Sequence, residues 1–332
     1  MRDKTADAEA IVRQAVELVE RRYAFPRVAS KIASAVRERL TGGEFAGMIV
    51  DRAFCKRLTR VFQELSRDQH MGFAYFDKPQ PMRDEAGYVF GALDEDDIIE
   101  ARHWNCGFAA VRRLDGNVGY IDLRQFTPVA IGGPTATAAM RLVADTEALI
   151  IDLRSNDGGR QDMAAHIAGH LFSEPTQLSS RYNYVTGEFT EYWSAPETEG
   201  RRFGDKPLFL LVGKHTFSAA ECFAYDMHQL GRATLVGERT AGGANPTKIY
   251  TLTPHVWMAI PYGFHVSPIT GTDWEGVGVS PDVEVPAAAA LNEAHRLALL
   301  GVRDTLDREG LARLLDELRT EVETALERLS GS

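Results

Sequence analysis

Hydrophobic residues recur at helical spacing through the first 67 positions of the chain. Ile11, Ala15, Leu18 and Val19 form one apolar face, which predicts an amphipathic helix. Proline is favoured in the first turn of a helix, so a second helix is expected from Pro26 to about residue 41. A third is expected from about residue 46 to 65. Because no strand pattern separates these helices, residues 1–67 are predicted to form a small helical domain.

Short apolar runs bounded by turn residues replace the helical periodicity from residue 68 onward. Residues 71–76, 107–112 and 118–123 have the pattern of strands. Residues 148–153 have the pattern of a buried parallel strand, with helices on either side at 136–144 and 161–172. This alternation predicts an α/β core over residues 68–286. A hairpin is expected within residues 177–205, and further strands are expected at 208–212, 233–236, 248–252, 256–260, 264–266 and 283–285.

The last segment, residues 287–332, is predicted to be a helical tail. Its leucines and valine form a stripe at helical spacing, comprising Leu311, Leu314, Leu315, Leu318, Val322, Leu326 and Leu329. Such a stripe packs against other helices, so contact with the N-terminal helices or a homo-oligomer through this C-terminal helix is expected. The opposite face is rich in glutamate and aspartate, which argues against a helix lying on a membrane.

Charge and composition argue against some classes of binding partner. The formal net charge is −10, with 37 Lys and Arg against 47 Asp and Glu, which disfavours nucleic acid and anionic membranes as partners. No apolar run approaches the length of a membrane span, and no signal peptide pattern follows Met1. Cys55, Cys106 and Cys222 lie far apart without CxxC spacing. A cytoplasmic protein without a cofactor or structural zinc is therefore expected.

Ser218 is the first candidate for chemistry. It follows the apolar run 208–212 and precedes a predicted helix, and a sharp strand-to-helix turn can expose a serine hydroxyl as a nucleophile. Ser218 and Glu221 also have the spacing of a capping box, in which each side chain bonds the backbone of the other. Both interpretations stay open on spacing alone.

A second candidate is the turn that contains Gly158 and Gly159, directly after the predicted strand 148–153. In open α/β sheets, ligands bind at the carboxyl ends of the strands. Backbone amides of such a glycine turn can point outward as donors to an anion. The turn has neither the GxGxxG nor the P-loop pattern, so no nucleotide is implied.

Histidines supply the candidates for a catalytic base. His215 lies three residues before Ser218, and His70 lies at the start of the first predicted strand, so the base is left open between them. His166 and His170 are four residues apart on one helix, but the glutamate of an HExxH zinc site is missing. The acidic run 94–97 is interpreted as a solvated turn, and no metal site is predicted.

Four sequence blocks resemble those of the tail-specific, or C-terminal-processing, serine peptidases. Residues 152–159 (DLRSNDGG) resemble the DLRxNxGG turn of that family, and residues 216–221 (TFSAAE) resemble its T-x-S-A-x-E turn. Residues 237–240 and 276–282 resemble two further blocks in the same order. The helices before His70 are similar to the N-terminal part of the interphotoreceptor retinoid-binding-protein branch. The resemblance covers residues 7–286 and leaves the tail uncovered.

The resemblance implies a crotonase- or ClpP-like fold of ββα units with Ser218 as the nucleophile. The lysine of the family's Ser-Lys dyad is absent, because Gly243 stands at its position and Lys248 is out of register. The segment between residues 70 and 118 is also too short for the family's inserted PDZ domain.

The lysine-free, tricorn-like branch instead uses histidine and glutamate, whose places fall on His70 and Glu275. Gln69 replaces the serine that orients the histidine in that branch. The oxyanion hole is expected to consist of the backbone N–H groups of Gly158 and Ala219.

These observations predict a serine hydrolase, most simply a peptidase that forms an acyl-enzyme through Ser218, His70 and Glu275. Its substrate would be a peptide or a small acyl compound. Two alternatives remain open: a non-catalytic carrier of a hydrophobic ligand such as a retinoid or fatty acid, and a hydrolase of small amides or esters in a biosynthetic pathway. The sequence gives neither the identity of the substrate nor the pathway.

Overall fold

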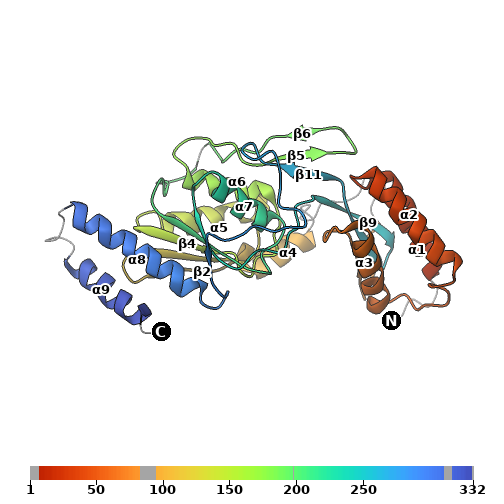
Figure 1. Ribbon diagram of the computed structural model, residues 1–332, viewed down its shortest axis with the longest axis horizontal. Coiled ribbons are helices and arrows are strands. Elements are labelled where there is room, and N and C mark those ends of the chain that lie inside the picture. The colour runs from red at the N-terminus through yellow and green to blue at the C-terminus, as the bar shows by residue number, and fades with distance from the viewer. Residues whose placement is uncertain (1–6, 83–94, 197, 310–315, 331–332) are drawn as a thin grey trace. The chain divides into compact units, whose positions relative to one another are not determined.

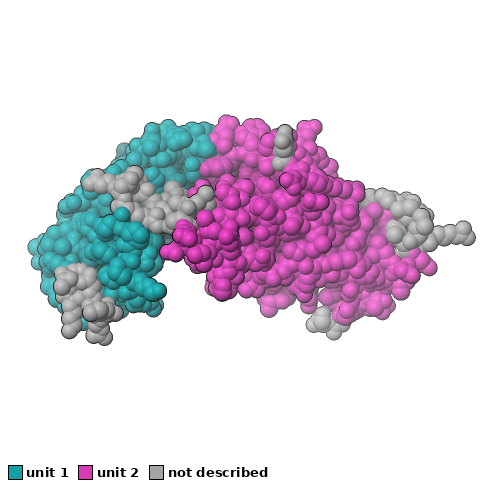
Figure 2. Space-filling model, turned by 180° about the vertical axis from the view of Figure 1, so that it is seen from behind, with its two compact units in different colours: residues 1–92, 180–190, 243–266 teal, residues 93–179, 191–242, 267–332 magenta. Residues whose placement is uncertain are grey.

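The computed structural model describes residues 7–82, 95–196, 198–309 and 316–330 (Figure 1). The chain forms two compact units, which are coloured separately in Figure 2. The first contains residues 1–92, 180–190 and 243–266, and the second contains residues 93–179, 191–242 and 267–332. The domain boundaries suggested by the sequence, after residues 67 and 286, stay predictions.

The three predicted N-terminal helices are present in the first unit as α1 (Ala8–Arg22), α2 (Pro26–Thr41) and α3 (Arg52–Ser66). The third begins later than the predicted residue 46. Asp51 is its N-cap, and its carboxylate accepts hydrogen bonds from the backbone of Ala53 at 2.8 Å and Phe54 at 3.0 Å. These bonds satisfy the free amides of the first turn, so the helix starts at the residue after Asp51.

A three-stranded antiparallel sheet packs against these helices. Its order is β1 (Gly72–Tyr75), β10 (Val256–Pro261) and β9 (Thr247–Thr253). Buried residues of the helices, such as Val12, Ile32 and Phe54, share one apolar cluster with Met258 and Ile260 of β10. Residues far apart in the sequence thus form the core of this unit.

A second small sheet in the first unit consists of β11 (Gly263–Val266), β5 (Ser180–Asn183) and β6 (Phe189–Thr190). The pairing of β5 with β6 is antiparallel, so the hairpin predicted within residues 177–205 is present. β5 also pairs antiparallel with β11, which fixes the hairpin to a strand 80 residues further along the chain.

The second unit is built on a six-stranded sheet. Its strands, in spatial order, are β12 (Val283–Glu284), β8 (Thr234–Gly237), β7 (Leu208–Val212), β4 (Ala148–Asp152), β3 (Val118–Leu123) and β2 (Phe108–Leu114). All neighbouring pairs are parallel except β2 and β3, which are antiparallel. The buried apolar runs at 148–152 and 208–212 are the central strands, as a sheet covered on both faces requires.

Three helices connect the parallel strands in turn: α5 (Val129–Leu142), α6 (Gln161–Leu171) and α7 (Ala219–Gln229). Because such crossovers are right-handed and the strands progress in one direction, these helices belong on one face of the sheet. α4 (Glu95–His103) and a short 3-10 turn η1 (Asn105–Gly107) precede β2. Part of the predicted acidic turn is therefore helix, because Glu95, Asp96 and Asp97 lie in the first turn of α4, where carboxylates favour the helix dipole.

The C-terminal tail is helical, as predicted, and forms α8 (Ala290–Glu309) and α9 (Asp316–Ser330). Ala294, Ala298 and Leu299 of α8 share an apolar cluster with one face of the sheet, and Val322 of α9 belongs to the same cluster. Leu318, Leu326 and Leu329 pack against it. Leu311, Leu314 and Leu315 lie outside the described residues. The leucine stripe thus has a partner inside this unit.

No helix within the described ranges is both long enough and apolar enough to span a bilayer. The apolar residues of the tail helices pack against the sheet.

His170 of α6 predicts an acid-sensitive fold. Its side chain is fully buried, and neither ring nitrogen has a hydrogen-bond partner among the described residues. Burial, and secondarily His166 and Arg202, lower the pKa of His170 to about 4. The folded state therefore binds a proton less readily than the unfolded chain, whose histidine pKa is about 6.5. The stabilisation is complete above pH 6.5 and is lost as pH falls toward 4.

We expect His170→Leu to reduce the pH dependence of the unfolding free energy between pH 7 and 4.5, measured by urea denaturation. The difference should reach about 2–3 kcal/mol. His215→Leu is the matched control, because His215 is exposed. An equal pH dependence in the wild type and His170→Leu would contradict this account.

Candidate active site

Ser218 lies at the turn between strand β7 and helix α7, where its backbone has φ 55° and ψ −120°. A positive φ is rare for a residue with a Cβ, and such strain gathers at functional sites. A serine nucleophile on a sharp strand-to-helix turn has this character, because the turn lifts the hydroxyl clear of the sheet. Ser218 is half-buried. The predicted turn is thus present, with a strained serine at its apex.

Thr216 anchors the turn to the neighbouring strand. Its hydroxyl donates to the carbonyl oxygen of Leu153 at 2.8 Å and accepts from the backbone N–H of Gly213 at 3.0 Å. The backbone N–H of Phe217 donates to the carbonyl oxygen of Asn156 at 3.0 Å. The backbone before Ser218 is therefore bonded to the loop that follows β4.

Glu221 anchors the other side of the turn. Its buried carboxylate accepts from the Ser218 N–H at 3.0 Å through Oε2, which is the glutamate half of the predicted capping box. Its Oε1 accepts from the hydroxyl of Thr240 at 2.5 Å and from the N–H of Gly242 at 2.6 Å. Thr240 Oγ1 in turn accepts from the N–H of Val279 at 2.7 Å. One carboxylate thus connects the serine turn with two other sequence blocks.

The glycine turn lies directly against Ser218. Gly158 has φ +107°, and a Cβ added to it would lie 2.8 Å from Ser218 Cβ and 3.0 Å from the backbone nitrogen of Ala219. Gly159 has φ +124°, and a Cβ there would collide with the carbonyl oxygen of Phe126. Both positions therefore need glycine, for backbone conformation and for space.

The backbone donors around Ser218 correct one part of the predicted oxyanion hole. The N–H of Gly158 donates to the side-chain oxygen of Asn156 at 2.9 Å, so this donor is occupied by an Asx turn. Within the described residues, the N–H groups of Ala219 and Gly159 have no hydrogen-bond acceptor. Ala219 thus keeps the free amide that an oxyanion hole needs.

The Gly159 amide points toward the serine side of the sheet. The carbonyl oxygen of Gly158 accepts from Phe126, which continues β3, at 2.7 Å. Because a trans peptide points its C=O and N–H in opposite directions, the Gly159 N–H points away from β3. In the strand order, β4 has β7 as its other neighbour, and β7 leads to Ser218. The second free donor is therefore Gly159.

Asp152 and Arg154, from the first resembling block, have a structural role. The Asp152 carboxylate accepts from Tyr120 at 2.9 Å and from the guanidinium of Arg154 at 2.5 and 2.9 Å. Arg154 also donates to the carbonyl oxygen of Ala287, just before α8. This pair fixes the end of β4, and with it the start of the glycine turn.

His70 lies in the first unit, just before β1. Its backbone N–H donates to the buried Asp68 carboxylate at 3.0 Å, and burial lowers the pKa of the imidazole to about 4. Asp68 also accepts from Asn245 at 2.9 Å and Tyr23 at 3.2 Å. Sequence reasoning missed Asp68 and named Gln69, whose side chain is exposed. The signal that could have revealed it is the spacing, because an aspartate commonly bonds the backbone N–H two residues further on.

Glu275 lies in the second unit, on the turn that follows the buried Trp274. The Trp274 ring packs on Tyr225 of α7 with the ring centroids 5.2 Å apart. The next residue, Gly276, donates its N–H to the carbonyl oxygen of Gly242 at 2.9 Å. The turn carrying Glu275 is thus bonded to the loop that Glu221 holds.

The structure brings together four of the predicted site residues in the second unit, namely Ser218, Ala219, Gly158 and, through the Gly242 loop, Glu275. His70 belongs to the first unit, so its pairing with Ser218 stays a prediction. The other candidate base, His215, is exposed, and no hydrogen bond joins its ring to Ser218 within the described part of the chain.

Other candidates are accounted for by their contacts. Lys248 lies on β9, with its ammonium 5.6 Å from the centre of the Tyr262 ring. The Cys222 thiol is buried, which raises its pKa well above the ordinary value, and it donates to Asp226 at 3.7 Å. The His166 ring bonds Thr137 at 3.0 Å. These contacts give a structural role to each side chain.

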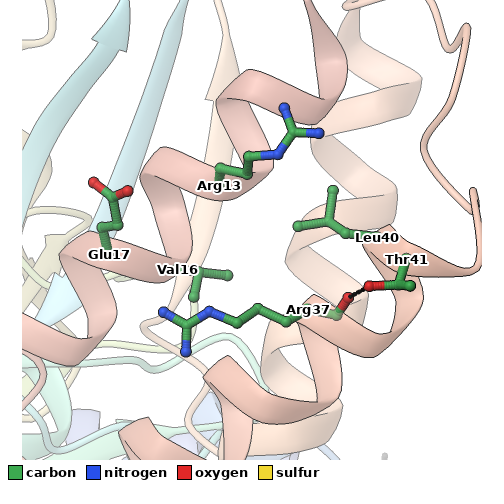
Figure 3. Close-up of a pocket in the computed structure, with 6 residues that line it drawn as sticks. All are labelled: Arg13, Val16, Glu17, Arg37, Leu40 and Thr41. Atoms are coloured by element: carbon green, nitrogen blue, oxygen red, sulfur yellow. Dashed lines mark hydrogen bonds between the residues drawn. The ribbon is translucent and has the colours of Figure 1, made fainter.

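A pocket of about 410 Å³ lies between α1 and α2 of the first unit (Figure 3). Figure 3 shows its six lining residues, which are Arg13, Val16, Glu17, Arg37, Leu40 and Thr41. Arg37 donates to the Glu20 carboxylate at 2.6 and 2.7 Å, and Arg13 donates to Glu9 at 2.6 Å. The two guanidiniums in its lining therefore already have carboxylate partners.

The family follows from comparison with known proteins. A model of peptidase family S41 matches residues 117–285, about half of the chain. The chain belongs to peptidase family S41. A second model, the N-terminal domain of these peptidases in eukaryotic IRBP, matches residues 5–97. The family resemblance inferred from the four blocks and the N-terminal helices is confirmed.

Relatives in the family are named for carboxyl-terminal processing. The chloroplastic carboxyl-terminal-processing peptidase 1 of Arabidopsis thaliana is 29% identical over 168 residues, covering 50% of this chain and 33% of the relative. The carboxyl-terminal-processing protease of Synechocystis sp. is 31% identical over 173 residues, covering 51% and 39%. The chain therefore spans well under half the length of these curated relatives.

Solved structures share the fold. The photosystem II D1 C-terminal processing protease has a TM-score of 0.50 at 15% identity, covering 85% of this chain and 94% of that one. The tricorn protease has a TM-score of 0.55 at 16% identity, covering 94% and 37%. The predicted fold class, a mixed α/β core with a helical N-terminal region and C-terminal helices, is confirmed.

The contacts of Glu221 lead to a prediction for Glu221→Gln. A glutamine side chain has one acceptor oxygen where the carboxylate has two. Its NH₂ group would therefore face either the N–H of Ser218 or the donors of Thr240 and Gly242. A buried donor without an acceptor costs about 1–3 kcal/mol. We expect urea denaturation to show a loss of this size, together with weaker labelling of Ser218 by a fluorophosphonate. Glu323→Gln, on the exposed face of α9, is the control. Unchanged stability of Glu221→Gln would contradict the anchoring role.

Proposed function

We propose that the protein is a serine peptidase that forms an acyl-enzyme on Ser218. The observation that carries the proposal is the strained serine at φ 55°, ψ −120°, in van der Waals contact with the glycine turn of an S41 chain. Strain of this kind is costly and persists where the surrounding structure holds it. A helix cap alone requires no positive φ, because cap residues normally have extended backbone.

The proposed reaction begins with a peptide carbonyl beside the Ser218 hydroxyl. His70 takes the hydroxyl proton as Oγ attacks the carbonyl carbon, and the oxygen becomes an oxyanion. The N–H groups of Ala219 and Gly159 donate to that oxygen. The proton on His70 passes to the leaving amine, the C–N bond breaks, and water later attacks the acyl-enzyme by the same route. Glu275 orients the imidazole in this scheme.

A histidine base suits a site without lysine. Burial lowers the pKa of His70, so the imidazole is neutral at pH 7, and Glu275 would have to stabilise the imidazolium as the proton is taken up. A lysine in the same role would have to lose most of its ordinary basicity to be neutral at that pH. The absence of the family lysine at Gly243 is therefore compatible with catalysis.

The carrier alternative receives little support from the pocket in the first unit. Sites for retinoids or fatty acids are lined mostly by apolar side chains, whereas four of the six residues here are charged or polar. Hydrolysis of a small amide or ester in a biosynthetic pathway stays an alternative, because it would use the same Ser218 machinery.

The proposal also includes a substrate class, a cellular location and an oligomeric state. A peptide or small acyl substrate follows from the serine chemistry. A cytoplasmic location is proposed from the three buried, free cysteines, which suit a reducing compartment. A homo-oligomer is a weaker part of the proposal, because the described leucines of α9 pack within their own unit.

Substitutions at the three candidate residues test the mechanism. We expect Ser218→Ala to abolish peptide hydrolysis and fluorophosphonate labelling while the unfolding midpoint stays near that of the wild type. His70→Ala should lower turnover by about 10²–10⁴, the usual contribution of a general base. His215→Ala is the matched control and should stay active. Activity lost in His215→Ala and kept in His70→Ala would move the base to His215.

The pKa of His70 predicts the acid limb of the activity profile. The base works only when neutral, so activity is lost as pH falls through its pKa, and burial moves that pKa from 6.5 to about 4. We expect kcat/KM to be half-maximal near pH 4 and to fall about tenfold per pH unit below it, measured with a fluorogenic peptide over times too short for unfolding. A tenfold fall per pH unit that begins near pH 6.5 would instead indicate an ordinary, solvated histidine.

A further inference from the structure

Asp226 is a buried acid on the helix that follows the nucleophile, and the proposed reaction makes no use of it. It lies on α7, one turn after Cys222, and is 5% exposed. Among the described residues no cation pairs with it. A buried carboxyl without a cation is costly unless hydrogen bonds stabilise it, so its contacts call for a physical account.

Asp226 and three other residues form a closed ring of hydrogen bonds. Asp226 Oδ1 accepts from both the N–H and the hydroxyl of Ser179, at 3.0 and 2.5 Å. Asp226 Oδ2 accepts from the Cys222 thiol at 3.7 Å. The side-chain amide of Gln161 donates to Cys222 Sγ at 3.5 Å and to the carbonyl oxygen of Ser179 at 3.2 Å. The direction of each bond suits a carboxylate at Asp226 and a protonated thiol.

The ring joins the starts of two helices that matter for the site. Gln161 is the first residue of α6, directly after the glycine turn and Arg160. Cys222 lies in the first turn of α7, which begins directly after Ser218. The spacing between the two helix starts sets where the oxyanion donors lie relative to the serine hydroxyl. A misplacement of about 1 Å can cost 10²-fold in rate.

We propose that Asp226 is a positioning residue for the Ser218 turn, acting through the ring it forms with Ser179, Cys222 and Gln161. The inference rests on the proposed function, because the property it controls is the reactivity of Ser218. Asp226 holds α7 against the start of α6 and so keeps the Ala219 and Gly159 amides at a fixed distance from the nucleophile.

The ring should respond to pH near neutrality. Burial raises the pKa of Asp226 to about 7, and the Ser179 and Cys222 hydrogen bonds oppose that rise. The groups that hydrogen-bond Asp226 are Ser179 and Cys222. Of these only Cys222 titrates, and burial and the nearby carboxylates of Asp226 and Glu221 keep it protonated. When Asp226 gains a proton, one of its two oxygens becomes a donor, and the bond from the thiol is lost or reversed.

The test is the rate of Ser218 labelling by a fluorophosphonate between pH 5 and 9. In the wild type we expect a partial step near pH 7, with the higher rate on the alkaline side. Asp226→Asn keeps an acceptor for Ser179 but presents an NH₂ donor to the Cys222 thiol, as the protonated acid does, so it should label at the slower acid-side rate at every pH and lack the step. Ser179→Ala removes one bond to the carboxylate, so its step should move to higher pH. Asp226→Ala should label at least about 10-fold more slowly at pH 8.

Two results would overturn the inference. One is a step near pH 7 that persists in Asp226→Asn, and the other is a wild-type labelling rate in folded Asp226→Ala. Thermal unfolding of each variant identifies any that fail to fold. If Asp226→Ala does not fold, the pH profiles of Ser218 labelling in Asp226→Asn and Ser179→Ala decide whether the inference holds.

An unlabelled wild type would refute the proposed function. In that case the ¹³C carboxyl shift of Asp226 still tests the ring. Because the Ser179 hydrogen bonds lower the pKa of Asp226, that pKa should be higher in Ser179→Ala than in the wild type, and an unchanged pKa contradicts the ring.

Discussion

The buried carboxylate of Glu221 is the interaction on which the site depends. It accepts from Ser218, Thr240 and Gly242, and Thr240 passes the connection on to Val279. Hydrogen bonds to a charged acceptor are stronger than neutral ones, and the interior strengthens them further. A strained residue persists only where its neighbours over-determine its conformation. The Glu221 carboxylate supplies that constraint to Ser218 through a single backbone N–H.

The glycine turn and the serine turn are two halves of one arrangement. Asn156 uses its side chain to bond Gly158 and Leu123, and its carbonyl oxygen to bond Phe217. The side-chain bond closes the glycine turn, and the carbonyl bond reaches the residue before Ser218. Because Gly158 has no Cβ, its backbone can approach Ser218 to contact distance. Close approach, backbone strain and buried polar bonds therefore reinforce one another.

The sequence predicted the elements whose signals are local. The helices of the first 66 residues follow from apolar spacing, and the buried strands at 148–152 and 208–212 follow from continuous apolar runs. The start of α3 was wrong because the Asp51 cap outweighed the weak helical pattern before it. The start of α4 was misread because an acidic run looks the same in a turn as at a helix start.

The sequence motifs of the candidate site could be recognised, but its hydrogen bonds could not be predicted. Ser218, Ala219 and the glycine turn were named as candidates because the sequence blocks that contain them resemble those of the family, and their catalytic roles stay predictions. The occupied amide of Gly158 was not, since it depends on the rotamer of Asn156. Asp68 and Asp226 were missed because their partners, Asn245 and Ser179, lie 177 and 47 residues away. Long-range polar contacts leave no periodic signal in a sequence.

The identity of the base is also a matter of energetics. Lysine has an ordinary pKa near 10.4, so a neutral lysine at pH 7 would need a lowering worth about 4–5 kcal/mol. Histidine is already largely neutral there, and burial of His70 makes it more so. Replacing the lysine position by Gly243 therefore removes the need to stabilise a neutral amine. The lowered pKa also makes His70 a weaker base than an ordinary imidazole, so proton transfer needs a partner that stabilises the imidazolium, which is the role proposed for Glu275. The buried Asp68 side chain fixes the backbone that carries His70.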